Sequence, residues 1–131
     1  MKKNLEKDYH RFCIVESDKK ESFRLKGKIW IEGEGGTFFG MGRAELLEKI
    51  KEYGSISKAA QAMNISYKKA WDLVESMNKQ AKSPLVITKI GGKGGGGAKL
   101  TPKGEEILRQ FKKLYSRFKN FLEKEIKNFK F

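Results

Sequence analysis

The residues of this sequence best suited to chemistry are hydrogen-bond donors gathered at the start of one expected helix. Ser66, Lys68 and Lys69 follow the turn-forming stretch Met63-Asn64-Ile65, and serine is a preferred helix N-cap. Hydroxyl, ammonium and backbone N–H groups at a helix start suit phosphates and base edges. The spacing therefore predicts a helix end that binds a polyanion.

A second group of candidates lies in the glycine-rich stretch Ile90–Gly97, IGGKGGGG. Its letters include GxGxxG, but a dinucleotide site also needs a strand before the glycines and a helix directly after them. Here Ala98-Lys99-Leu100 indicates a strand instead, and the phosphate-binding P-loop pattern fails for want of a Ser or Thr after Gly-Lys. We expect a loop in which Lys93 and Lys99 bring charge beside bare backbone N–H groups, with a plain flexible turn as the alternative.

Other site chemistry has little support in the sequence. The chain has one His and one Cys; His10 and Cys13 would supply two ligands on one helical turn, but two ligands do not close a metal site. One cysteine allows no intrachain disulfide, nothing marks Cys13 as a nucleophile, and no nucleophile–base set is visible. We expect no enzyme activity, no metal and no cofactor.

The charge balance points to the same kind of partner as the candidate helix end. Lys and Arg number 29 against 16 Asp and Glu, which gives a formal net charge of +13 and a pI near 9.8. This excess favours nucleic acid as partner first and an anionic membrane surface second. A basic protein with neither partner remains an alternative, because charge does not specify function.

The sequence shows no sign of export or membrane insertion. The start, MKKNLEKDYHRF, has no apolar core like that of a secretory signal. No stretch approaches the roughly 20 apolar residues that a membrane span needs. We therefore expect a cytoplasmic protein with no membrane partner.

Two helices joined by a tight turn across Gly54–Gln80 would position the donors. Small Ala59 and Ala60 permit a close helix crossing, and Asn64 tolerates the left-handed conformation that ends a helix. The second helix, about 66–80, has an apolar stripe made of Tyr67, Ala70, Trp71, Val74 and Met77. This is the plan of a helix-turn-helix, whose second helix enters the DNA major groove; a helical hairpin without that function is the alternative.

The preceding residues predict support for this pair. Alternation over Phe23–Glu32 indicates a half-buried strand, with Phe23, Leu25, Ile29 and Ile31 facing inward. A turn at 33–36 and a returning strand at Thr37-Phe38-Phe39 complete a hairpin. A helix over Arg43–Tyr53 follows, stopped by Gly54; its expected inner face is Leu46, Leu47, Ile50 and Tyr53.

The residues after the helix pair predict a wing and a long helix. Leu85–Thr88 and Ala98–Leu100 read as strands flanking the glycines, the plan of a winged helix domain. Thr101 and Pro102 then start a helix as cap and first residue. Its apolar residues recur at helical spacing almost to the end of the chain, over a span of about 40 Å at ~1.5 Å per residue.

A helix of that length exceeds what one small domain can cover, so part of its apolar stripe needs another surface. A second subunit is the first expectation, which makes a homodimer through Phe111, Leu114, Tyr115, Phe118 and Leu122. The alternatives are packing against the N-terminal hairpin of the same chain and, last, an anionic membrane.

Several short segments together carry a family resemblance. They are Gly54-Ser55-Ile56-Ser57, Ser66-Tyr67-Lys68, Ala70-Trp71, Met77-Asn78 and GGKGGGGAKLTPKGE. Residues 25 to 118 or so resemble the N-terminal DNA-binding domain of ModE-type molybdate-responsive transcriptional regulators. The resemblance implies a winged helix-turn-helix that dimerises and binds operator DNA through Ser57, Lys58, Ser66, Tyr67, Lys68, Lys69 and Lys93.

The sequence departs from that family at its end. Full regulators of this type continue into a molybdate-binding domain, whereas this sequence stops at Phe131. No oxyanion-sensing residue can therefore be carried over. A stand-alone regulator and one served by a separate molybdate-sensing protein both remain open.

The predicted fold is mainly α with small β (α+β): a winged helix-turn-helix with an N-terminal β-hairpin and a long C-terminal dimerisation helix. Its expected parts are an arm of uncertain structure (1–22), the DNA-binding domain (23–101) and the helix (102–131).

The predicted function is a homodimeric, sequence-specific regulator that binds double-stranded DNA at an inverted repeat. The recognition helix (about 66–80) would enter the major groove, and the wing (about 85–100) would touch the backbone. The expected DNA-binding residues are Ser57, Lys58, Ser66, Tyr67, Lys68, Lys69, Lys93, Gly94, Gly95 and Lys99. The alternatives are a protein–protein module that regulates another DNA-binding protein and, third, a nucleotide-binding protein that uses the glycine loop.

Overall fold

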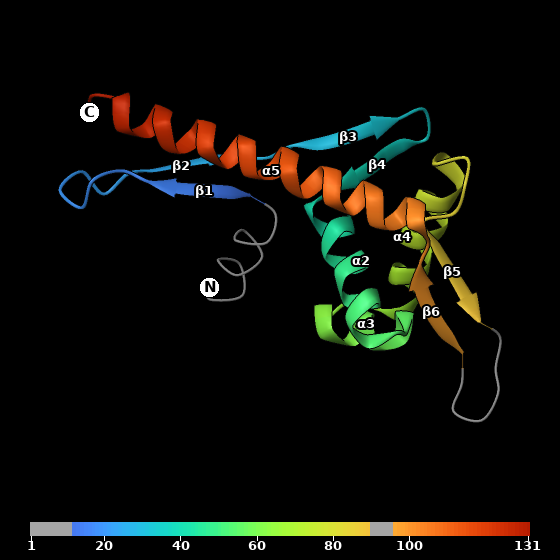
Figure 1. The fold of residues 1–131 in the computed structure, drawn as a ribbon. Coiled ribbons are helices and arrows are strands. Elements are labelled where there is room, and N and C mark those ends of the chain that lie inside the picture. The colour runs from blue at the N-terminus through green and yellow to red at the C-terminus, as the bar shows by residue number, and fades with distance from the viewer. Residues whose placement is uncertain (1–11, 90–95) are drawn as a thin grey trace. The chain divides into compact units, whose positions relative to one another are not determined.

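The structure, a computed structural model, describes residues 12–89 and 96–131 (Figure 1). The chain divides into two compact units, which are described separately. The central unit is Trp30–Phe111, and the terminal unit combines Met1–Ile29 with Lys112–Phe131. These units differ from the ranges expected from the sequence, because the long helix contributes its first residues to one unit and the remainder to the other.

The central unit holds three consecutive helices and two small hairpins. The helices are α2 (Met41–Tyr53), α3 (Ile56–Met63) and α4 (Tyr67–Gln80). Antiparallel strands β3 (Trp30–Gly33) and β4 (Gly36–Gly40) precede them, and antiparallel strands β5 (Val86–Lys89) and β6 (Gly97–Leu100) follow. Helix α5 (Pro102–Asn128) begins directly after β6. The α+β winged helix-turn-helix predicted from the sequence is confirmed.

The core of the central unit is formed largely by β4 and α2. Phe39, Leu46, Leu47 and Ile50 are fully buried, and α2 lies against both α3 and β6. Gly54 ends α2 in the left-handed conformation (φ 67°), and its N–H donates to the Ile50 carbonyl at 2.8 Å. The predicted glycine stop is therefore confirmed. Tyr53, which was expected to face inward, is instead exposed.

The strand predicted over Phe23–Glu32 is wrong as a single element. It is split into β2 (Arg24–Gly27), which pairs with β1 (Cys13–Glu16), and β3, which pairs with β4. The two halves serve different hairpins in different units, and the alternation in burial ends at Ile29. As a result Phe23 and Ile31 are exposed rather than buried, while Leu25 and Ile29 are half-buried.

The terminal unit is a hairpin packed on the later part of α5. Cys13 and Val15 of β1 are buried together with Leu122 and Ile126 of α5. Partly buried apolar side chains surround this cluster: Leu25, Tyr115 and Phe118. Part of the stretch left unassigned as an arm is thus a core strand. The hairpin that packs on the long helix here pairs β1 with β2, so it shares only Arg24–Gly27 with the hairpin predicted over residues 23–39.

This packing bears on the expected dimerisation set, which stays a prediction. Phe111 is buried in the central unit, edge-on to Phe39 at 5.2 Å between ring centroids. Leu122 is buried in the terminal unit, where Tyr115 and Phe118 also lose much of their surface. A side chain covered within its own chain has no surface left for a second subunit. Of the five residues, only Leu114 is exposed.

One polar group borders the cluster of the terminal unit. Burial, together with a hydrogen bond with Cys13, raises the pKa of Tyr115 to about 12. The phenol therefore stays protonated at neutral pH, because losing its proton would leave a charge beside apolar side chains. Cys13 thus has a structural role in the core.

A glycine sets how closely α5 approaches the wing. Gly104, in the first turn of α5, lies so near the Leu85 backbone that a Cβ would collide with the Leu85 carbonyl group. That carbonyl also accepts a hydrogen bond from the Thr101 N–H at 2.9 Å, so it cannot move freely. No helix in the described parts of the chain is both long and apolar enough to cross a bilayer.

We predict opposite effects for alanine at two helical glycines. Gly104→Ala should lower the free energy of unfolding by about 1–3 kcal/mol, because overpacking against backbone outweighs the helix propensity gained. Gly42→Ala, whose Cβ meets nothing within 4 Å, should raise it by up to about 1 kcal/mol. Urea unfolding measures both, and a stabilised Gly104→Ala would show that the close approach is not real.

Candidate nucleic-acid interface

The turn between α3 and α4 is built as the sequence predicted. Asn64 adopts the left-handed conformation (φ 57°), and the Ile65 N–H donates to the Ala60 carbonyl at 3.0 Å. Ala59 and Ala60 are buried, and α3 contacts both α2 and α4. The small side chains let the helices cross closely, which fixes the direction in which α4 leaves the turn.

Both helices of the pair start with a serine cap. The Ser55 hydroxyl accepts from the Lys58 N–H at 3.2 Å, and the Ser66 hydroxyl accepts from the Lys69 N–H at 3.0 Å. Five side chains of the two first turns are solvent-exposed: Ser57, Lys58, Tyr67, Lys68 and Lys69. The cap predicted at Ser66 is confirmed, and both lysines of that turn extend into solvent.

The apolar stripe of α4 is narrower than predicted. Ala70, Val74 and Met77 are buried, and Trp71 is half-buried. Tyr67, which was also expected in this stripe, is 53% exposed and lies edge-on to the Trp71 ring, 6.2 Å between centroids. Residue 67 is the first of the helix, where the core below α4 has already ended, so its ring belongs to the outer surface.

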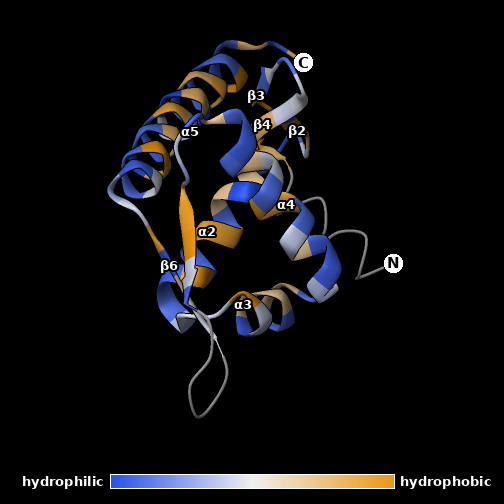
Figure 2. Cartoon of the chain, turned by 90° about the vertical axis from the view of Figure 1, so that its right-hand side faces the viewer, coloured by the Kyte–Doolittle hydropathy of each residue, from blue (hydrophilic) through white to orange (hydrophobic). Residues whose placement is uncertain are grey.

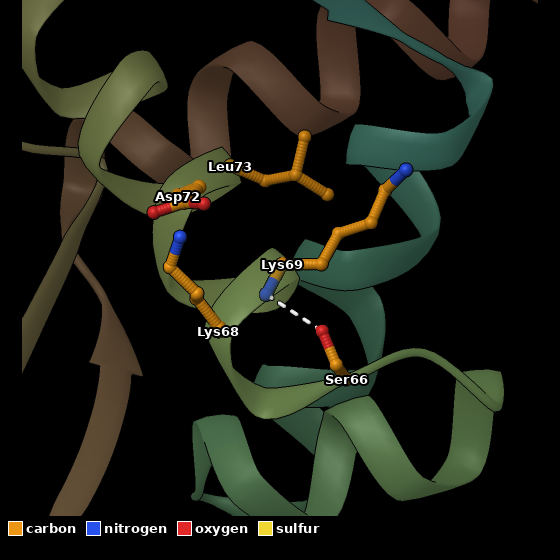
Figure 3. Close-up of a pocket in the computed structure, with 5 residues that line it drawn as sticks. All are labelled: Ser66, Lys68, Lys69, Asp72 and Leu73. Atoms are coloured by element: carbon orange, nitrogen blue, oxygen red, sulfur yellow. Dashed lines mark hydrogen bonds between the residues drawn. The ribbon is translucent and has the colours of Figure 1, made fainter.

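An open hollow of about 350 Å³ lies on the first two turns of α4 (Figure 3). Its lining residues are Ser66, Lys68, Lys69, Asp72 and Leu73. Three of them were predicted from the sequence. Asp72 was not, because a single acidic residue on the outer side of a helix looks like ordinary surface; its four-residue spacing from Lys68 was the available signal.

The wing is present as an antiparallel hairpin. Val86 pairs with Leu100 and Ile87 with Lys99. Lys99 and Lys89 are exposed, while Ala98 and Leu100 are buried. The Ala98 N–H donates to the Gly54 carbonyl at 2.9 Å, which ties β6 to the end of α2. Lys93, Gly94 and Gly95 lie outside the described residues, and Lys89 was not predicted as a contact.

The strands also decide between two interpretations of the glycine stretch. It joins β5 to β6, which run antiparallel, and α5 begins only after Thr101. A dinucleotide site requires a helix directly after the glycines, within a parallel βαβ unit. The alternative of a nucleotide site built on this loop therefore lacks its scaffold.

Asn78 connects the wing to α4 through hydrogen bonds. Its Oδ1 accepts from the Leu85 N–H at 2.8 Å and from the Val86 N–H at 3.1 Å, and its Nδ2 donates to the Val86 carbonyl at 3.0 Å. On the other side, the Thr101 hydroxyl donates to the Pro84 carbonyl at 2.7 Å and accepts from the Gly104 N–H at 3.0 Å. The base of the wing is thus held by both α4 and α5.

Not every cation of the central unit faces solvent. Arg43 of α2 donates through Nη1 to the Ser76 hydroxyl at 3.0 Å and to the Phe38 carbonyl at 3.3 Å. Burial lowers the pKa of Arg43, yet arginine stays charged at neutral pH. Arg43 therefore links α2, α4 and β4, and it is absent from the exposed basic surface.

The exposed donors of the central unit gather at one end. Figures 1 and 2 show the start of α4, helix α3 and the far ends of β5 and β6 at the same end of the unit. Among the exposed lysines of these elements, Lys58 belongs to α3, Lys68 and Lys69 to the first turn of α4, and Lys89 is the last residue of β5. A capped helix start beside a lysine-bearing hairpin is the arrangement by which winged helix domains approach a duplex.

These features define the class as a winged helix-turn-helix domain, and comparison with known proteins agrees. Residues 41–105 match the family described as Bacterial regulatory helix-turn-helix protein, lysR family. The domain is further of the ModE type, as the sequence segments predicted, because curated ModE proteins match half to three quarters of the chain.

Three relatives illustrate the match. "Molybdenum transport protein ModE" of Azotobacter vinelandii is 36% identical over 101 residues, 77% of this chain and 37% of that protein. "Molybdenum-pterin-binding protein MopB" of Rhodobacter capsulatus is 46% identical over 76 residues, which are 58% of this chain and 28% of that protein. "DNA-binding transcriptional dual regulator ModE" of Escherichia coli K12 is 45% identical over 69 residues, which are 53% of this chain and 26% of that protein. The chain thus spans about a quarter to just over a third of these relatives.

Among solved structures, ArgP from Mycobacterium tuberculosis is similar over 57% of this chain and 27% of that chain. The TM-score is 0.44 and the sequence identity 22%.

We predict that Asn78→Ala loosens the wing. Three half-buried backbone groups would lose their partner, which should lower the free energy of unfolding by about 2–4 kcal/mol. Urea unfolding measures the loss, and faster amide hydrogen exchange at Leu85 and Val86 locates it. Lys79→Ala, the exposed neighbour on the same helix, is the control and should change stability by less than about 0.5 kcal/mol. Unchanged exchange at both amides would contradict the role of Asn78.

Proposed function

We propose that this protein is a DNA-binding transcriptional regulator without enzymatic activity. One observation carries the proposal: the capped, lysine-bearing start of α4 lies at the same end of the central unit as the wing. In this proposal α4 enters the major groove with its first turns, and the wing follows the sugar–phosphate backbone beside it. The names of the relatives, transcriptional regulators among them, support the same function.

The placement of the charged residues fits a major-groove role for α4 and a backbone role for the wing. Ser57 and Lys58, in the first turn of α3, would contact backbone phosphates. The wing would make further phosphate contacts through Lys89, Lys93, Gly94, Gly95 and Lys99. Ser66, Tyr67, Lys68 and Lys69 open α4 and would reach base edges and the flanking phosphates. A net charge of +13 adds long-range attraction to any duplex. Affinity would come from phosphate contacts, and sequence preference from the residues of α4.

Full activity would need a homodimer on an inverted repeat. Two copies would place their α4 helices about 34 Å apart, one turn of DNA, in successive major grooves. The exposed apolar side chains of α5 offer a surface for that association. Leu114 and Phe121 lie seven residues apart on one face of the helix and are 43% and 57% exposed. Leu114 belongs to the expected set and Phe121 is added to it, whereas Phe111 and Leu122 are left out because they are buried.

Control by molybdate follows only from the names of the relatives. A molybdate sensor, whether elsewhere in the protein or on a separate polypeptide, would supply that control. The part of the chain described by the structure would then be the DNA-binding output.

We predict different consequences for two lysines on DNA. Lys99→Ala should weaken binding about equally on all sequences and reduce the slope of log affinity against log salt by about one, as loss of a phosphate contact does. Lys68→Ala should change the sequence preference as well. Selection from a randomised duplex library, followed by salt titration of chosen sequences, measures both effects. Affinity that does not change between about 50 and 200 mM salt would contradict the proposal.

We predict that replacing the exposed apolar residues of α5 separates the subunits. The double variant Leu114→Glu and Phe121→Glu should raise the dimer dissociation constant at least about a hundredfold, because large apolar side chains contribute about 1.5–3 kcal/mol each when buried. Sedimentation velocity over a concentration series measures this. Ile31→Thr removes an exposed apolar side chain from β3 and is the control. A double variant that sediments like the unmodified protein would place the dimer contact elsewhere.

A further inference from the structure

We infer that Asp72 is a specificity-determining residue, whose carboxylate accepts a hydrogen bond from the exocyclic amine of one cytosine in the major groove. The inference rests on the proposed function, and it adds a residue that was not among the DNA-binding residues predicted from the sequence. Asp72 is the acidic member of the otherwise neutral or basic lining of the hollow on α4.

The position of Asp72 suits a base contact. It lies five residues after Tyr67, the first residue of α4, and is exposed. With Lys68 it occupies one side of the helix, since residues four apart share a face. That side is opposite the buried Ala70, Val74 and Met77, and Figure 3 shows both side chains beside the hollow. Because recognition helices read bases with their N-terminal turns, Asp72 would come near the groove floor rather than the backbone.

Asp72 contributes little to the stability of α4. It lies beyond the first turn, so it neither caps α4 nor gains much from the helix dipole, whose effect fades within that turn. Aspartate is also a poor helix former. An ion pair with Lys68 would have the acid C-terminal to the base, the weaker of the two orientations at this spacing. A contact made only in the complex is therefore the stronger account of this residue.

Electrostatics define what the carboxylate can select. A negative charge at this basic end repels phosphates, so it lowers affinity for DNA in general. It repels the O6 and N7 acceptors of guanine and the O4 of thymine as well. Cytosine presents the N4 amine alone, whereas adenine places its N7 acceptor beside its N6 amine, where a bidentate amide fits better than a carboxylate. Asp72 would thus reject three bases and accept cytosine.

The experiment compares the full chain with two variants on a randomised duplex library. Asp72→Asn keeps the size of the side chain but adds donors, so preference at one position should move from cytosine toward adenine. Discrimination for cytosine there should fall about 5- to 100-fold, the usual cost of one mismatched pair. Glu75→Gln removes the same charge one turn further along α4 and does not line the hollow. Both variants should bind random DNA up to about fivefold more tightly.

A second measurement tests the amine directly. In the selected sequence, the cytosine is replaced by 2-pyrimidinone, which lacks the N4 amine. The unmodified protein should bind the analogue more weakly than the original sequence, by about the same factor that Asp72→Asn costs on the original sequence. The Asp72→Asn variant should bind the two DNAs with nearly equal affinity.

The outcomes separate this inference from the proposed function. If the unmodified protein shows no sequence preference, both fail. If it shows a preference that Asp72→Asn leaves unchanged, only the role of Asp72 is overturned. A preference altered equally by Glu75→Gln also overturns it, because the effect would then be one of charge alone. Thermal unfolding of both variants, expected to match the unmodified protein, shows that neither change acts through the fold.

Discussion

The structure of the central unit depends on the close crossing of α3 and α4. Ala59, Ala60 and Ala70 are buried where the two helices meet, and any larger side chain would push the helices apart. The left-handed Asn64 and the cap at Ser66 then fix where α4 begins. With Val74 and Met77 buried against the core, the opposite side of α4 can only face solvent. The outward direction of Lys68 and Asp72 is therefore a consequence of apolar packing.

The placement of charge follows from the same constraint. Arg43, a half-buried cation, is held by hydrogen bonds to the Ser76 hydroxyl and the Phe38 carbonyl. Lys58, Lys68, Lys69 and Lys99 remain in solvent, where hydration costs nothing and a polyanion can reach them. A surface made only of such cations would bind every duplex alike. An acidic residue among them lowers affinity and gives the interface a means to distinguish bases, which is how repulsive elements contribute to specificity.

The apolar stripe of α5 is divided among three environments, and this division links the two units to the proposed dimer. Phe111 completes the core of the central unit, while Leu122 and Ile126 complete that of the terminal unit. Leu114 and Phe121 are left on the outer face. One helix therefore stabilises both units of the chain and still carries apolar surface for a second copy.

The sequence by itself determined the elements whose signals are local. The cap at Ser66, the left-handed turn at Asn64, the stop at Gly54 and the start of α5 at Thr101 and Pro102 all depend on interactions within a few residues, so residue type and spacing were sufficient. The strands flanking the glycines were predicted for the same reason.

Only the tertiary structure decided which surfaces are covered. Alternation over Phe23–Glu32 could not reveal that β2 pairs with β1 while β3 pairs with β4. Helical spacing could not separate the buried Leu122 from the exposed Phe121, nor place Tyr67 outside the core of α4. Asp72 acquired its role from the hollow it lines. Burial and strand pairing depend on contacts between residues that are distant in the chain. A periodic pattern indicates which residues share a face of a helix or strand, but it does not indicate what packs against that face.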